Sequence, residues 1–121
     1  DNEATRLLAP YLNAVAGKRE GSMMLAALGM EKTPRRALIG VMGVMQAALR
    51  DAIFLAKGLR EPPLQPGLSK QAEALAAALT PERLLAFYDF TGELVGRISR
   101  NAASAAVTCA LTSDVYRICF Q

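Results

Sequence analysis

The amino-acid sequence predicts an all-α protein: a single compact domain, residues 1–121, folded as a bundle of five or six helices. Apolar residues recur along most of the chain at the three- and four-residue spacing of a helix face, and no stretch alternates as a half-buried strand does. Hydrophobic residues make up 52% of the chain but aromatic residues only 6%. Much of the apolar share is alanine, a strong helix former with a small side chain, so we expect closely packed helices.

Two helices are predicted near the start of the chain. The first covers residues 3–16, with Pro10 inside it predicting a kink or a late start and Gly17 ending it. Its apolar face holds Leu7, Leu8, Tyr11, Leu12 and Val15. The second helix covers residues 20–28 and ends at Gly29. Its inward side chains are expected to be Met23, Met24, Leu25 and Leu28.

A long third helix is predicted to form the centre of the bundle. Thr33 is expected to cap it and Pro34 to occupy its first position, where the missing N–H costs nothing. The helix runs to about residue 57, and Gly58 ends it. Its small stripe, Gly40, Gly43 and Ala47, predicts the close approach of another helix.

Residues 59–68 form a proline-rich loop, which we expect to be extended and mobile. Ser69 is expected to cap a helix over residues 69–79, and Thr80–Pro81 repeats the start signal of the third helix. Asn101 is expected to cap the last helix. That helix has a stripe of Ala105, Thr108, Cys109, Thr112, Val115, Tyr116 and Cys119.

The sequence contains no motif that indicates catalysis, a cofactor or a metal. Histidine, the usual general base and metal ligand, is absent, and no glycine-rich phosphate loop is present. Cys109 and Cys119 are ten residues apart, about 15 Å along one helix, which is too far for a disulfide. We expect both thiols to pack in the core, as suits a reducing cytosol. Asp89 and Glu93 share a helix face, and an acid–base pair there is the enzymatic alternative to a solvated surface.

We expect a cytoplasmic protein, with no membrane and no small-molecule partner. The net charge is +3, with basic pairs at residues 18–19 and 35–36, so a mildly basic nucleic-acid-binding helical domain is an alternative function. The longest apolar stretch, residues 37–49, contains Gln46 and is shorter than the ~18–20 residues of a membrane span. Because the sequence begins at Asp1 rather than methionine, we expect a fragment of a longer protein.

The order of several motifs resembles a known family. The segment LRDAIFLAKG at residues 49–58 follows a long apolar helix and precedes the proline-rich loop; LLAFY follows at residues 84–88 and RNAA at residues 100–103. This order resembles the C-terminal domain of the delta-prime subunit of the bacterial DNA polymerase III clamp loader, with the gamma/tau subunit as the near alternative. The second asparagine of the family's Asn-x-Asn pair is replaced by Ala103.

The resemblance implies a collar domain: a helical bundle that packs against equivalent domains of the gamma/tau and delta subunits. The complete loader uses ATP to place a sliding clamp on primed DNA, so this chain would meet DNA only indirectly and would not itself be an enzyme. The candidate interface is Arg50, Asp51, Phe54 and Lys57 at the end of the central helix, together with Asn101. Alternatively, Arg50 and Lys57 simply complement the negative end of that helix, and Asn101 is first a helix cap.

Overall fold

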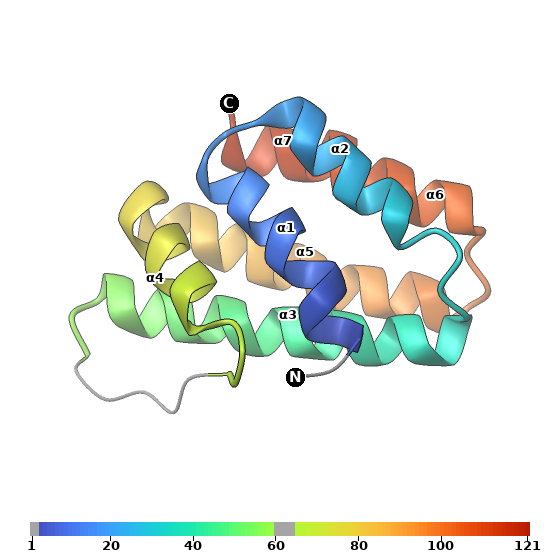
Figure 1. Cartoon of the computed structure of the whole chain (residues 1–121), viewed down its shortest axis with the longest axis horizontal. Coiled ribbons are helices and arrows are strands. Elements are labelled where there is room, and N and C mark those ends of the chain that lie inside the picture. The colour runs from blue at the N-terminus through green and yellow to red at the C-terminus, as the bar shows by residue number, and fades with distance from the viewer. Residues whose placement is uncertain (1–2, 60–64) are drawn as a thin grey trace.

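The computed structural model describes residues 3–59 and 65–121 and confirms a small bundle of helices without strands in that part of the chain (Figure 1). The helices are α1 (Glu3–Ala16), α2 (Glu20–Gly29), α3 (Arg35–Ala56), α4 (Ser69–Ala78), α5 (Pro81–Ser99), α6 (Ser104–Cys109) and α7 (Val115–Cys119). A π-helical turn, η1 (Ala110–Asp114), joins α6 to α7, so these three form one continuous helix. Residues 60–64 of the expected loop lie outside the described residues.

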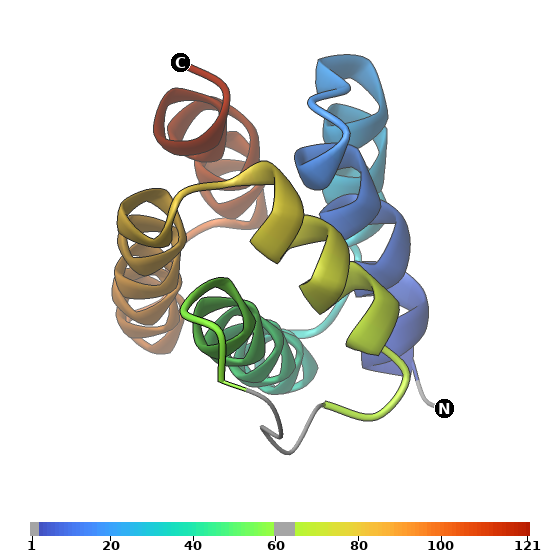
Figure 2. The same ribbon diagram turned by 90° about the vertical axis from the view of Figure 1, so that its left-hand side faces the viewer.

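The long helix α3 is central, as its apolar pattern predicts. It packs against α5, α4 and α1, and Figure 2 shows it nearly end-on with these helices around it. By length and composition α3 could also span a bilayer, since the helix is longer than the apolar run 37–49 considered above. In this fold α3 buries one side in the core, through Leu38, Val41, Met42, Met45, Ala48, Leu49, Asp51 and Ala52.

The helix start signals have different outcomes. Thr80 caps α5 as expected, its hydroxyl oxygen accepting a hydrogen bond from the Arg83 N–H at 3.2 Å. At α3 the cap position is Pro34 rather than Thr33, and at α4 it is Leu68 rather than Ser69; neither helix has a side-chain cap. A Thr–Pro pair therefore marks a helix start in both places, but the threonine hydroxyl caps only α5. Helix α1 begins at Glu3 and continues through Pro10.

Helix α2 faces the core with a side different from the predicted one. Met23 and Ala27 are buried, whereas Met24, Leu25 and Leu28 are exposed by 45%, 72% and 46%. The inward face was ambiguous from the sequence, because Met23, Met24 and Leu25 are consecutive and therefore point to different sides of the helix. The prediction that all four large apolar residues point inward is wrong.

The π-helical turn changes the buried face of the last helix. Val107, Leu111, Val115 and Cys119 are buried at a constant spacing of four residues, which drifts around a regular helix of 3.6 residues per turn. The wider π turn absorbs this drift. Ala105 and Cys109, expected in the core from regular periodicity, are exposed instead. The hydroxyl of Tyr11 in α1 donates a buried hydrogen bond of 2.7 Å to the Leu111 carbonyl in this turn, which ties the first helix to the last.

No helix of the described chain covers the small stripe of α3. Gly40 and Gly43 are exposed, and a Cβ added to either would have no neighbour within 4 Å. The close approach occurs on α5 instead, where a Cβ at Gly92 would lie 3.2 Å from the side-chain nitrogen of Gln46. Within the described residues, therefore, no helix makes the predicted close approach to Gly40 and Gly43.

Candidate functional site

The candidate interface begins where α3 ends. Gly58 adopts φ +80°, a left-handed conformation that suits glycine, and the Leu59 N–H returns to the Phe54 carbonyl at 3.0 Å. This turn leaves Lys57 exposed, Leu59 largely exposed and Phe54 half-buried. The end of α3 therefore presents an apolar surface beside one lysine.

Asp51 is not part of that surface, because its side chain is completely buried. One carboxylate oxygen accepts a hydrogen bond from the Gln65 backbone N–H at 2.5 Å, and the other lies 3.0 Å from the Arg50 guanidinium. Arg50 is partly exposed and covers the carboxylate from the solvent side. The structure thus gives Asp51 a role that the sequence did not predict: it fixes the returning end of the proline-rich loop to the central helix.

Asn101 lies at the opposite end of the bundle from Lys57. It follows α5 with φ +70°, and its N–H bonds to the Ile98 carbonyl while the Ala102 N–H bonds to the Arg97 carbonyl. Asn101 therefore closes the C-terminus of α5, and the expected cap of the last helix is wrong, since α6 begins only at Ser104 with Ala103 at the cap position. The 22 residues of α3 separate the two ends by about 33 Å. The five candidate residues do not form one patch.

The start of α5 completes the surface at the end of α3. A shallow pocket of about 160 Å³ lies between them, lined by Ile53, Lys57, Pro81, Glu82 and Leu85. Leu85 is 52% exposed and adds a large apolar side chain to the rim. The sequence carried one signal for it: Leu84 and Leu85 are adjacent, and only Leu84 continues the buried stripe of Phe87.

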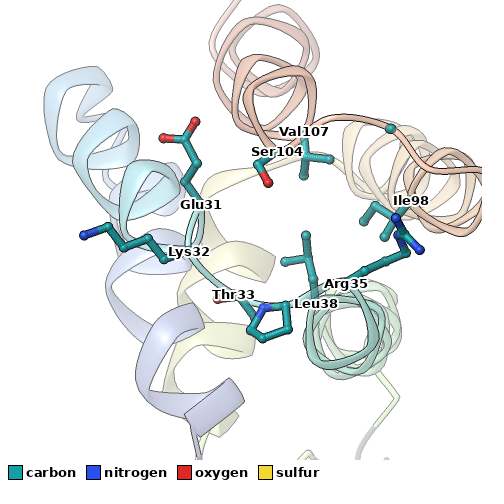
Figure 3. A pocket seen from close by; sticks show the side chains of 10 residues that line it. Glu31, Lys32, Thr33, Arg35, Leu38, Ile98, Ser104 and Val107 are labelled. Carbon is teal, nitrogen blue, oxygen red and sulfur yellow. The ribbon is translucent and has the colours of Figure 1, made fainter.

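A larger pocket of about 320 Å³ lies at the other end of α3 (Figure 3). Leu38, Ile98 and Val107 supply apolar side chains from three different helices, and Glu31, Arg35 and Ser104 add polar groups. Ser104 has no histidine available as a general base, since the chain contains none. The pocket has room for an apolar side chain.

The two thiols have different environments. Cys119 is buried, as expected, and burial raises the pKa of its thiol to about 12, against smaller opposing effects of Arg83 and Lys18. Burial also raises the pKa of Tyr11 well above its ordinary value, and the Cys119 charge adds to this. Cys109 is exposed, so its predicted place in the core is wrong. A buried thiol that resists ionisation is a poor nucleophile.

The remaining candidates for chemistry do not converge. Asp89 and Glu93 both lie exposed on α5, and Glu93 is 3.9 Å from Arg97, so this pair does not form an enclosed acid–base site. Among the described residues, no group of three acidic, cysteine or histidine side chains could hold a metal ion. Comparison with protein-family models, with curated proteins and with solved structures gives no match to this chain.

Proposed function

We propose that this chain is a subunit-assembly module, a helical bundle whose surface binds other protein subunits rather than a substrate. The observation that carries the proposal is the shallow pocket where α3 ends and α5 begins, lined by Ile53, Pro81 and the exposed Leu85, with Lys57 and Glu82. Exposed apolar side chains gathered around a shallow pocket are typical of protein-binding surfaces. We call this surface the α3–α5 patch.

The specific assembly we propose is the collar of the bacterial DNA polymerase III clamp loader. The order of the LRDAIFLAKG, LLAFY and RNAA segments supports it. The partners are then the equivalent domains of the gamma/tau and delta subunits, in the cytoplasm, with DNA reached only through the complex. Within the candidate interface, Lys57 and Phe54 contact the partner. Asp51 supports the patch from inside by fixing the loop beside it, and Asn101 supports the fold at the far end.

Native mass spectrometry tests the proposal by mixing this chain with a gamma/tau collar domain at equal, micromolar concentrations. We expect a defined hetero-oligomer, which the variant Leu85→Glu weakens at least tenfold because a charge would be buried in the apolar centre of the interface. Leu25→Glu is the matched control, since Leu25 is even more exposed but lies on α2, away from the α3–α5 patch.

Two unmixed species would contradict the assembly role. A complex that tolerates Leu85→Glu would keep the assembly role but exclude the α3–α5 patch as its interface. Circular dichroism of each variant alone checks that its fold is intact. We expect intact folds, because replacing an exposed leucine leaves the core unchanged.

A further inference from the structure

The end of the bundle where α3 begins and α5 ends carries the net positive charge of the chain. It is formed by residues 30–37 and 92–104, which meet around the larger pocket. These two segments hold five exposed cations and two carboxylates: Lys32, Arg35, Arg36, Arg97 and Arg100, with Glu31 and Glu93. The excess of three positive charges equals the net charge of +3 of the whole chain, so the charges elsewhere cancel. We call this surface the basic end.

Three of these cations lie where they weaken the fold. Lys32 precedes α3, and Arg35 and Arg36 are its first two residues, at the end of a helix where the macrodipole is positive. Carboxylates stabilise such an end, yet the first turn of α3 contains none and no side chain caps it. Among the described residues, none of the three cations forms an ion pair. Since natural sequences break such local rules mainly at functional sites, the start of α3 is suited to an external anion.

The pocket at the basic end adds an apolar seat to the cationic surface. Its volume is about 320 Å³, and Leu38, Ile98 and Val107 supply buried apolar side chains to its wall. Figure 3 shows Arg35 on one side of this wall and Glu31 across the pocket from it. The ligand that fits such a surface is anionic over most of its length and apolar at one point.

Two classes of polyanion match the charge of the basic end, nucleic acid and acidic peptide. No aromatic side chain lines the pocket, whereas single-stranded nucleic acids bind by stacking their bases on aromatic rings. The apolar wall also gives a phosphate backbone nothing to contact. An acidic peptide matches both parts of the surface, because its carboxylates pair with arginine and lysine and an apolar side chain of the same segment fills the pocket.

We propose that the basic end binds an acidic peptide segment of a partner protein, with one large apolar side chain of that segment in the pocket. Carboxylates of the segment pair with Lys32 and Arg35, which both line the pocket, and approach the free N–H groups at the start of α3. Glu31 repels these carboxylates from the other side and weakens the binding. The length of α3 separates the basic end from the α3–α5 patch by about 33 Å, so both surfaces can be occupied together. This binding does not depend on the clamp-loader assembly.

Fluorescence anisotropy of a labelled peptide, a leucine flanked on both sides by glutamates, tests the proposal with the whole chain at low salt. We expect binding that weakens as salt is added, and at least fivefold weaker binding of a matched peptide with serine in place of the leucine. No binding of the leucine peptide up to about 0.5 mM protein, or equal binding of the two peptides, would overturn the proposal. Tighter binding of a labelled oligothymidine of the same net charge would overturn it too, by assigning the basic end to nucleic acid.

Three variants locate the binding on the surface. Lys32→Gln/Arg35→Gln should weaken binding of the leucine peptide at least tenfold without lowering the melting temperature, because it also removes cations from the positive end of α3. Lys18→Gln/Lys70→Gln is the matched control, since it removes two exposed cations from elsewhere in the chain and should change the affinity less than twofold. Glu31→Gln should tighten binding two- to threefold by removing the repelling carboxylate. Equal losses in the two double variants, or a Glu31→Gln protein that binds no more tightly than the wild type, would refute the assigned site.

Discussion

Replacing Asp51 by alanine distinguishes an internal support from an interface residue. The substitution removes the acceptor of the Gln65 N–H, a hydrogen bond to a charged group worth about 1.5–3 kcal/mol. The Arg50 pair adds at most ~1 kcal/mol, since the guanidinium is 45% exposed, and alanine recovers about 0.5 kcal/mol through its higher helix propensity. The free energy of unfolding should therefore fall by about 2–3 kcal/mol, and the melting temperature by roughly 6–12 °C for a domain of this size.

Urea and thermal unfolding of the isolated chain, followed by circular dichroism, measure this loss. Asp51→Asn should lose about half as much, because its amide oxygen still accepts the Gln65 N–H without the charge. Asp89→Asn is the control, since Asp89 is exposed on α5. If Asp51→Ala unfolds within 0.5 kcal/mol of the wild type, a difference typical of surface substitutions, the support role is refuted.

Further predictions concern the core and the turns. Tyr11→Phe should lower the free energy of unfolding by about 1–2 kcal/mol in urea titrations, since the carbonyl of the π turn loses its buried donor. Gly67→Ala should lower the free energy of unfolding by about 2–3 kcal/mol in the same titration, because φ is +82° and the added Cβ would clash with Thr5 of α1. Gly58→Ala has a similar φ but open space around the Cβ, so it should lower the free energy of unfolding by only ~1–2 kcal/mol. A thiol reagent should label Cys109 rapidly and Cys119 only after unfolding; two equally fast thiols would contradict the assigned burial. Burial raises the pKa of Cys119 from 9.0 to about 12, so above pH 9 the unfolded chain loses the thiol proton more readily than the folded protein does. The free energy of unfolding should therefore fall between pH 9 and 12, by about 1.4 kcal/mol per pH unit. Cys119→Ala should flatten this decline in unfolding titrations at increasing pH.

The helices were predictable wherever an apolar stripe and a terminating glycine agreed. The stripe of α1, the central position of α3 and the cap at Thr80 all follow from local rules, because each depends on residues within two turns of one another. The same rules failed at α2, where apolar residues stand on every side and only the neighbouring helices decide which face is buried. They also failed at the π turn, since a spacing of exactly four residues looks locally like an ordinary helix.

The candidate site was only partly predictable from the sequence. Lys57 is exposed at the end of α3 as its position beside Gly58 suggests. The burial of Asp51 depends on a backbone N–H that is 14 residues away, and no side-chain pattern marks such a partner. Asn101 was assigned to the wrong helix, since asparagine suits both a helix start and the left-handed turn after a helix end. The two residues between Asn101 and the start of α6 at Ser104 decide between these roles.

The hydrogen bond between Tyr11 and Leu111 joins residues that are 100 positions apart, and this has a consequence for folding on the ribosome. Helix α1 leaves the exit tunnel 100 residues before the polar partner of its buried hydroxyl. During translation, α1 can pack only against the helices already present, and its tyrosine must keep water as a partner until the last helix arrives. Closure of the core is therefore a late, long-range step, and such non-local contacts form more slowly than the local pairing of α1 with α2.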